Sequence, residues 1–166
     1  MVGSFSKMLW GGLRTGWIRA DPATTLRLGR LKAAQDLGSG TLDQVACLRA
    51  LDRLPEIVRA RRETAAERYG VLSRALSEHL PEWRQHACHG GFSLWAQLPD
   101  AGAEQFVAAA LKQGVAVAGG AASAPDDMFL DHVRLCFAAE PAVLEEAVAR
   151  LSIAWAETAP RAPLLA

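Results

Sequence analysis

The chain has 166 residues, of which 51% are apolar and 22% are charged, so it is long enough to bury one substantial hydrophobic core or two smaller ones. Its 18 basic and 18 acidic side chains balance, which excludes a chain-wide field that would draw the protein onto nucleic acid or an anionic membrane. No apolar run approaches the roughly 18 to 20 residues that span a bilayer, and the three cysteines show no paired spacing, so we expect a protein of the reducing cytoplasm.

The first part of the chain predicts a strand followed by two helices. Residues 15–20 form a short β-prone run, after which Asp21 supplies a helix cap and Pro22 a first helical residue. A second helix is expected to begin at Thr41, whose spacing to Gln44 matches a capping box. The first helix, which a Gly-Ser-Gly segment ends, has an apolar side made of Leu26, Leu28, Leu31, Ala34 and Leu37.

The rest of the chain predicts one long helix followed by short mixed elements. Apolar residues at helical spacing run through residues 55–80, and Pro81 ends that helix. Beyond it we expect strands at 83–86, 92–98, 115–118 (short and buried) and 133–137, and helices at 103–113 and 140–158. This order predicts a small α+β domain with a partly antiparallel sheet, residues 54–166, beside the tail of a larger α/β domain, residues 1–53.

Two short motifs near the N-terminus combine residue types that suit an aldehyde cofactor carrying a phosphate group. The segment Ser4-Phe5-Ser6-Lys7 places a lysine on a tight loop, where its amine can form a Schiff base with an aldehyde. Arg14 follows among glycines, and its rigid guanidinium, with hydroxyls of Ser4 or Ser6, suits a phosphate dianion. The alternative is that Lys7 is a solvated loop lysine and Arg14 a surface charge.

These motifs resemble the cofactor loop of the class I and II aminotransferases, which are fold-type I pyridoxal-phosphate enzymes. Three further segments resemble parts of the same family in the same order. Residues 90–99 resemble its small-domain strand after a glycine pair, residues 113–117 its strand before a substrate-side loop, and residues 133–138 its strand with a carboxylate-binding arginine. The resemblance covers nearly the whole chain. It implies the C-terminal portion of a three-layer α/β transferase fold, with a truncated large domain and a small C-terminal domain.

The resemblance also implies roles for single residues in amino-group transfer. Lys7 would hold pyridoxal 5'-phosphate as a Schiff base and move the substrate's α-proton. Arg134 would clamp the substrate's α-carboxylate in a bidentate pair, and the alternative for Arg134 is a structural ion pair with Asp131 or Glu140. The phosphate would be held by Ser4, Ser6 and Arg14.

Some segments are similar to a narrower group, the MocR type of bacterial regulator. The resemblance lies in Trp-Gly-Gly-Leu-Arg-Thr-Gly-Trp at residues 10–17, in Asp-Leu-Gly at residues 36–38 and in the Arg-rich long helix. In such regulators a GntR-like winged helix precedes an aminotransferase-like domain that senses pyridoxal phosphate or its adduct with an amino compound. The alternative function is therefore effector sensing, with an amino acid or other amino compound as ligand and with DNA bound only through an N-terminal module missing from these residues.

The same resemblance indicates which parts of an active site the chain does not supply. In the family, the half of the large domain before the lysine provides the carboxylate that pairs with the pyridine nitrogen, the aromatic side chain that stacks on the ring, and a helix N-terminus for the phosphate. Active sites in the family form between two subunits, so a homodimer is expected of the full-length parent. We therefore expect this chain alone to be a weak or inactive enzyme.

Two other polar clusters receive structural interpretations. His86, Cys88 and His89 are close in sequence, but neighbours in an extended run point to opposite faces and no fourth metal ligand is evident. The basic cluster at residues 59–62 is interleaved with glutamates at helical spacing, which indicates a solvated helix face rather than a nucleic-acid site.

Overall fold

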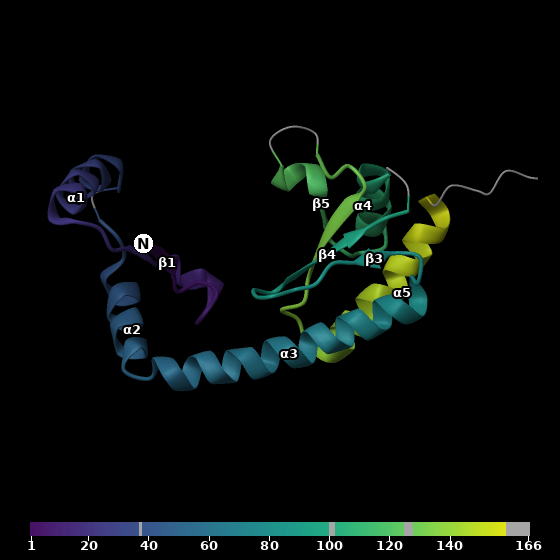
Figure 1. The fold of residues 1–166 in the computed structure, drawn as a ribbon, viewed down its shortest axis with the longest axis horizontal. Helices are drawn as coiled ribbons and strands as arrows, with labels where there is room; N and C mark the ends of the chain where they lie inside the picture. The colour runs from purple at the N-terminus through teal and green to yellow at the C-terminus, as the bar shows by residue number, and fades with distance from the viewer. Residues whose placement is uncertain (37, 100–101, 125–127, 159–166) are drawn as a thin grey trace, which may run out of the picture. The chain divides into compact units, whose positions relative to one another are not determined.

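The computed structural model describes residues 1–36, 38–99, 102–124 and 128–158. The chain divides into two compact units, Met1–Glu63 and Thr64–Ala166, which are purple to blue and teal to yellow in Figure 1. This division falls inside the long helix α3 (Leu54–His79), whereas the sequence places a boundary at the start of that helix. The assignment of residues 1–53 to a large-domain remnant and of residues 54–166 to a small domain stays a prediction. No described helix is long and apolar enough to cross a membrane.

A two-stranded antiparallel ladder begins the first unit. Strand β1 (Val2–Ser4) pairs with β2 (Gly16–Ile18), so that Ser4 lies opposite Gly16. The sequence predicts β2 but contains no signal for β1, because three residues are too few to show an alternating pattern. A Cβ added to Gly3 would lie 2.4 Å from the ring of Trp17, so this ring lies directly against the backbone of β1.

Helix α1 (Pro22–Asp36) begins where the sequence predicts. The carboxylate of Asp21 accepts a hydrogen bond from the N–H of Thr24 at 3.0 Å, and the side-chain and backbone bonds from Thr24 hold the pKa of Asp21 below its ordinary value. The expected apolar side of the helix is not covered, since Leu31 is 62% exposed and no residue of α1 is buried. Leu37, which the sequence assigns to that side, lies outside the described residues.

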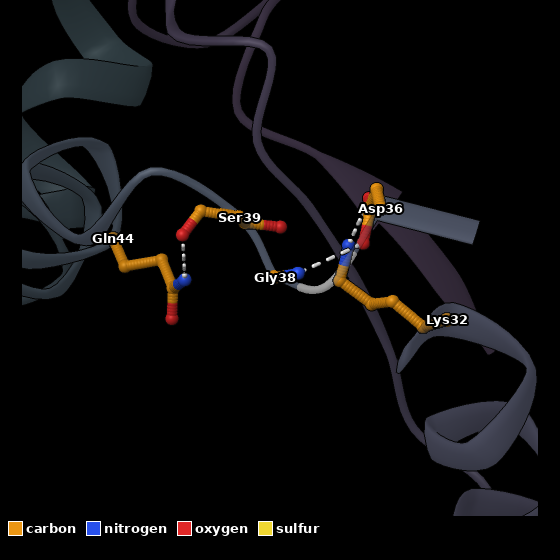
Figure 2. Close-up of polar contacts among 5 residues, drawn as sticks. All are labelled: Lys32, Asp36, Gly38, Ser39 and Gln44. Atoms are coloured by element: carbon orange, nitrogen blue, oxygen red, sulfur yellow. Dashed lines mark hydrogen bonds and ion pairs between the residues drawn. The ribbon is translucent and has the colours of Figure 1, made fainter. Parts of the chain in front are cut away.

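Helix α2 (Thr41–Leu51) begins at the predicted residue, but the predicted capping box is wrong. The N-cap is Gly40, and no side chain caps it. Thr41 is instead the first helical residue, so its hydroxyl is not placed to accept the N–H of Gln44, which bonds to the carbonyl of Gly40 at 3.2 Å. Figure 2 shows that the side-chain amide of Gln44 donates to the carbonyl of Ser39, also at 3.2 Å.

Helix α3 confirms the predicted long amphipathic helix that stops before Pro81. Only its C-terminal part contributes to a core, in the second unit. The buried residues of this part are Val71, Leu72, Ala75 and Leu76.

The second unit contains a four-stranded sheet with the order β3–β4–β6–β5. Each neighbouring pair is antiparallel, which corrects the expectation of a partly antiparallel sheet. Trp95 lies opposite Arg134 and Gln97 opposite His132 in the register of the two central strands. The strands are β3 (Arg84–Gln85), β4 (Ser93–Gln97), β5 (Ala118–Gly119) and β6 (His132–Cys136).

One face of this sheet is buried in the hydrophobic core. Side chains alternate along both central strands, so that Leu94 and Ala96 point to the same face as Val133 and Leu135, and all four are buried. These residues join one core cluster with α3, α4 (Ala103–Lys112) and α5 (Pro141–Thr158). The opposite face carries Ser93, Trp95, Gln97, His132, Arg134 and Cys136.

The strand predicted at residues 115–118 begins later than expected. Strand β5 starts at Ala118, and residues 115–117 are not in a strand. The reason is the end of α4, where Gly114 has φ +79° and donates to the carbonyl of Leu111 at 3.0 Å, while the N–H of Val115 donates to the carbonyl of Ala110 at 2.9 Å. This pair of bonds is a Schellman motif, so the N–H of Val115 serves the helix end and cannot join the sheet.

Candidate functional site

The loop that joins β1 to β2 carries the residues predicted to bind a cofactor. Phe5 anchors it, because its side chain is 6% exposed and its N–H donates to the carbonyl of Thr15 at 3.0 Å. A tight turn follows, in which the N–H of Leu9 donates to the carbonyl of Phe5 at 2.8 Å. The hydrogen bond between Phe5 and Thr15 therefore fixes the two ends of the loop.

Ser4, Ser6 and Lys7 lie at the start of this loop. The hydroxyl oxygen of Ser4 accepts the N–H of Ser6 at 3.2 Å, which leaves the hydroxyl hydrogen of Ser4 available to donate. Lys7 is exposed, and its ammonium group makes no hydrogen bond or ion pair with any residue that the structure describes. The amine is thus accessible to a ligand.

Arg14 has the most unusual backbone of the predicted site. It follows the short 3-10 helix η1 (Gly11–Leu13) and has φ +49° and ψ +24°, the left-handed conformation that costs a non-glycine residue about 1–2 kcal/mol. Its exposed side chain lines a cavity of about 690 Å³ within the first unit, together with Gly3, Trp17 and Lys32. Ser4, Ser6 and Lys7 do not line this cavity, which among the four predicted residues contains only Arg14.

Lys32 is the second cation in the lining of this cavity. Its ammonium group pairs with the carboxylate of Asp36 at 2.7 Å, and this hydrogen bond holds the pKa of Asp36 below its ordinary value (Figure 2). Among the described residues, the guanidinium of Arg14 has no such partner. An anionic ligand in this cavity would therefore meet Arg14 as the uncompensated positive charge.

Arg61 is a residue whose role the sequence does not reveal. It belongs to the basic cluster interpreted as a solvated helix face, but its side chain is half-buried and its Nε donates to the carbonyl of Met8 at 3.0 Å. A second guanidinium nitrogen donates to the carbonyl of Leu9. For Arg61 the interpretation is wrong, because the guanidinium fastens α3 to the turn beside Lys7.

Arg134 lies in the second unit, at the centre of β6. Its neighbours across the sheet are Trp95 on β4 and Ala118 on β5, and its side chain is exposed on the open face. The alternative of a structural ion pair is wrong for both proposed partners. Glu140 pairs with Arg68, and Asp131 bonds to other groups.

Beside Arg134 the open face carries a series of hydrogen-bonded polar groups that the sequence does not predict. The side-chain amide of Gln97 donates to Asp131 at 2.7 Å, and the other oxygen of Asp131 lies 2.6 Å from Nδ1 of His132. Nε2 of His132 lies 3.2 Å from Nε2 of His86. Hydrogen bonds donated by Gln97, which has the larger effect, and by His132 hold the pKa of Asp131 below its ordinary value. Asp131 is therefore a carboxylate at neutral pH.

Asp131→Asn is expected to lower the free energy of unfolding at pH 7 by about 1–3 kcal/mol, because an amide cannot accept from both Gln97 and His132. The folded-state pKa of Asp131 is lowered, so the stabilisation is complete above the unfolded value of about 3.9 and is lost as pH falls through the lower folded value. Urea unfolding of both proteins at a series of pH values measures the difference. A difference that stays constant down to pH 2 would contradict this, and Asp52→Asn, on an exposed turn, is the control.

No family model matches the chain. An aromatic-amino-acid aminotransferase of Thermococcus litoralis is 31% identical over 140 residues, which are 79% of this chain and 31% of the relative. An uncharacterised HTH-type transcriptional regulator of Bacillus subtilis, YdfD, is 29% identical over 150 residues, 82% of this chain and 29% of the regulator. The chain thus spans about a third of the length of the curated relatives that it matches.

Solved aminotransferases share the fold over nearly the whole chain. The α-aminoadipate aminotransferase of Thermus thermophilus matches 94% of this chain and 41% of its own chain, with a TM-score of 0.87 and 28% identity. The kynurenine aminotransferase of Pyrococcus horikoshii matches 96% of this chain and 41% of its own, with a TM-score of 0.84 and 28% identity. In sequence and in fold, the chain therefore corresponds to the C-terminal part of a fold-type I pyridoxal-phosphate-dependent aminotransferase.

Proposed function

We propose that this chain is the C-terminal part of an aminotransferase that uses pyridoxal 5'-phosphate, with Lys7 as the residue that bonds to the cofactor. The observation that carries the proposal is the loop between β1 and β2, which presents a lysine amine without a partner among the described residues, on a segment whose sequence resembles the family's cofactor loop. Two similar structures support it. The Thermus protein was solved with N-(5'-phosphopyridoxyl)-L-leucine, and the Pyrococcus protein with PMP and kynurenine.

The residues of this loop fit the cofactor in their chemistry. When bound, pyridoxal phosphate supplies an electron sink for the carbon next to the substrate's amino group. Nζ of Lys7 is exposed, and in this role it holds the cofactor and transfers the proton of that carbon. The residues that would hold the phosphate are Ser4 and Ser6, through their hydroxyls, and Arg14, through its uncompensated guanidinium.

The left-handed backbone of Arg14 supports its role in binding phosphate. Glycine would occupy this conformation without strain, yet the position carries the longest and most strongly basic side chain. Strained residues of this kind concentrate at ligand sites. The strained backbone of Arg14 therefore supports a guanidinium with a function in binding rather than a surface charge.

Arg134 is proposed to bind the α-carboxylate of an amino-acid substrate. Its guanidinium is exposed on the open face of the sheet and has no ion-pair partner among the described residues, which leaves its fork free for a bidentate pair. We infer that the full-length parent works in the cytoplasm as a homodimer, as the family resemblance implies.

A second candidate is an effector sensor of a MocR/GntR-type transcriptional regulator, in which the same residues bind cofactor and amino compound without turnover. The match to the Bacillus regulator favours it. In that case DNA is bound by a winged-helix module elsewhere in the parent. Expressing the parent gene and assaying amino transfer against ligand-dependent DNA binding separates the two candidates.

The first test is a titration of pyridoxal phosphate into the purified chain, followed by visible absorbance and by borohydride reduction. We expect a saturable band and covalent attachment at Lys7, one of three lysines in the sequence. Lys7→Ala should abolish both. Lys112→Ala, which removes an exposed lysine of α4, is the matched control and should change neither. Reduction that labels Lys7, Lys32 and Lys112 equally would overturn the proposal.

The same titration measures the contribution of Arg14 to phosphate binding. Arg14→Gly should weaken pyridoxal phosphate binding by about 10-fold or more, as expected for the loss of a charge-assisted hydrogen bond. It should not lower thermal stability, because glycine relieves the left-handed strain. A loss of binding that follows a loss of stability would instead assign Arg14 a structural role.

A further inference from the structure

A cavity of about 470 Å³ lies on the open face of the sheet in the second unit and plays no part in the proposed cofactor chemistry. Its size falls in the range of small-molecule sites. Two aromatic rings, Trp95 and Phe129, and two imidazoles, His86 and His132, line it together with Cys88 and His89. It is therefore an apolar hollow with a small set of polar groups.

The aromatic wall is built with a strained residue. Phe129 has φ +63°, the left-handed region that a phenylalanine rarely adopts. Its carbonyl accepts the N–H of His132 at 3.0 Å and is packed so closely on Gly120 that a Cβ there would lie 2.2 Å from it. The strained turn places the Phe129 ring 5.6 Å from the ring of Trp95 and 5.2 Å from that of His132.

Hydrogen bonds hold the polar side chains of the cavity in place. His132 is only 9% exposed, and Asp131, a carboxylate, accepts its Nδ1–H at 2.6 Å. Nε2 of His132 must then share one hydrogen with Nε2 of His86, 3.2 Å away. The planes of the two rings differ by 23°, and their centroids are 5.2 Å apart.

Counting hydrogens on these two rings determines what Nδ1 of His86 can do. In the neutral pair, one hydrogen serves Asp131 and the other lies between the two Nε2 atoms, so Nδ1 of His86 is bare and accepts. If the pair gains one proton, the bond to Asp131 and the bond between the two Nε2 atoms both remain only when the new hydrogen lies on Nδ1 of His86. This nitrogen then becomes a donor, and the pair carries a positive charge. No described residue partners this nitrogen.

We propose that this cavity binds a small aromatic carboxylate, with the ring against Trp95 and Phe129 and the carboxylate at the protonated His86–His132 pair. The proposal goes beyond the proposed function and uses neither Lys7 nor Arg14. The protonated pair presents the Nδ1–H of His86 to the carboxylate, a donor that the neutral pair lacks, so binding at this nitrogen takes up one proton. Because protonation supplies this donor, we expect higher affinity at pH 5.5 than at pH 8.

The surrounding charges agree with an anionic ligand. Arg84 lies opposite Gln97, and Arg134 lies opposite Trp95, so both stand on the same face as the pair. The negative charge of Asp131 is already engaged by two donors. Helices α4 and α5 pack on the other face. The titratable and charged groups of the described residues on this side are Arg84, Cys88, His89, Asp131, Arg134 and Cys136.

Phenylacetate is the probe, titrated into the full chain at pH 5.5 and pH 8 and followed by the ring 15N signals of labelled histidine. We expect saturable binding with a dissociation constant of about 1–10 mM at pH 5.5, at least about 10-fold weaker at pH 8. The His86 and His132 signals should shift. Cyclohexylacetate should bind more weakly, because it lacks the flat ring, and benzyl alcohol should show no comparable dependence on pH.

His86→Gln is the decisive variant, since His86 is half-buried at the end of the hydrogen-bonded series and its loss leaves Asp131–His132 in place. It should weaken phenylacetate binding at pH 5.5 by about 10-fold or more and remove the pH dependence. His89→Gln, an exposed lining residue, should leave both unchanged. If His86→Gln unfolds, Trp95→Leu replaces it and should also weaken binding.

Absence of saturation at pH 5.5, or equal affinities at the two pH values, would overturn the proposal. So would binding that persists in both His86→Gln and Trp95→Leu. Failure of pyridoxal phosphate to label Lys7 bears only on the proposed function, because the two titrations use different ligands and different residues.

Discussion

Amide hydrogen exchange is expected to proceed at least about 100-fold faster in the first unit than in the second. In the first unit, the buried hydrophobic residues among those described are Phe5 and Cys47. Exchange from local opening follows the free energy of that opening, and few buried apolar contacts mean a small one. Mass spectrometry of peptides after timed exchange at pH 7 measures the difference.

Two helices of similar length provide the matched comparison. Helix α1 has 15 residues and buries none of them, whereas α5 has 18 residues and buries five. An isolated helix of this length is marginal in water, so α1 should exchange within the earliest times and α5 should stay protected. Along α3, protection should rise toward the turns that contain Leu72 and Leu76. Equal protection of α1 and α5 would contradict the prediction, and repeating the measurement at two protein concentrations tests whether association covers α1.

The sequence predicts most of the helices and strands because their signals are local. Asp21 and Pro22 define the start of α1, and Pro81 follows the end of α3. Periodic apolar residues identify α4 and α5 for the same reason. Where local signals compete, the prediction is wrong, as at Val115, whose N–H completes the Schellman motif instead of a strand.

The same difference between local and long-range signals decides which residues of the candidate site the sequence predicts. Lys7 and Arg14 are recognisable because they occupy fixed spacings in one loop, which needs no knowledge of tertiary structure. The pair of His86 and His132 is not recognisable, because these residues are 46 positions apart and meet only when β3, β4 and β6 form one sheet. A histidine next to an aspartate carries no signal by itself.

Arg61 illustrates a different limit of sequence reasoning. Its guanidinium donates to two backbone carbonyls, and backbone acceptors are present at every residue. No partner residue type in the sequence therefore indicates this contact. The same holds for Arg68, which donates to the carbonyl of Ala138 as well as to Glu140.

The largest effect of a single substitution on stability is expected at Phe106. Its side chain is fully buried, and its ring lies 4.9 Å from the ring of Trp83 and 5.9 Å from that of Trp155. Phe106→Ala should lower the free energy of unfolding of the second unit by about 3–5 kcal/mol, through lost burial and the cavity left between the two tryptophans. Because domains of this size have about 5–15 kcal/mol in total, the variant should be close to unfolded at physiological temperature.

Leu111→Ala, on the same helix α4, separates the loss of packing from the effect of placing an alanine in this helix. Leu111 is 64% exposed, so its replacement should change the free energy of unfolding by no more than about 0.5 kcal/mol. Urea unfolding followed by tryptophan fluorescence measures both variants, since Trp83 and Trp155 report directly on the site. Equal effects of the two substitutions would contradict the prediction and would mean that α4 is not held by Phe106. A loss of stability in Phe106→Ala alone would show that the cluster of Trp83, Phe106 and Trp155 holds α4 and α5 together. The sheet packs on these helices, so the open face with Arg134 and the histidine pair depends on this cluster.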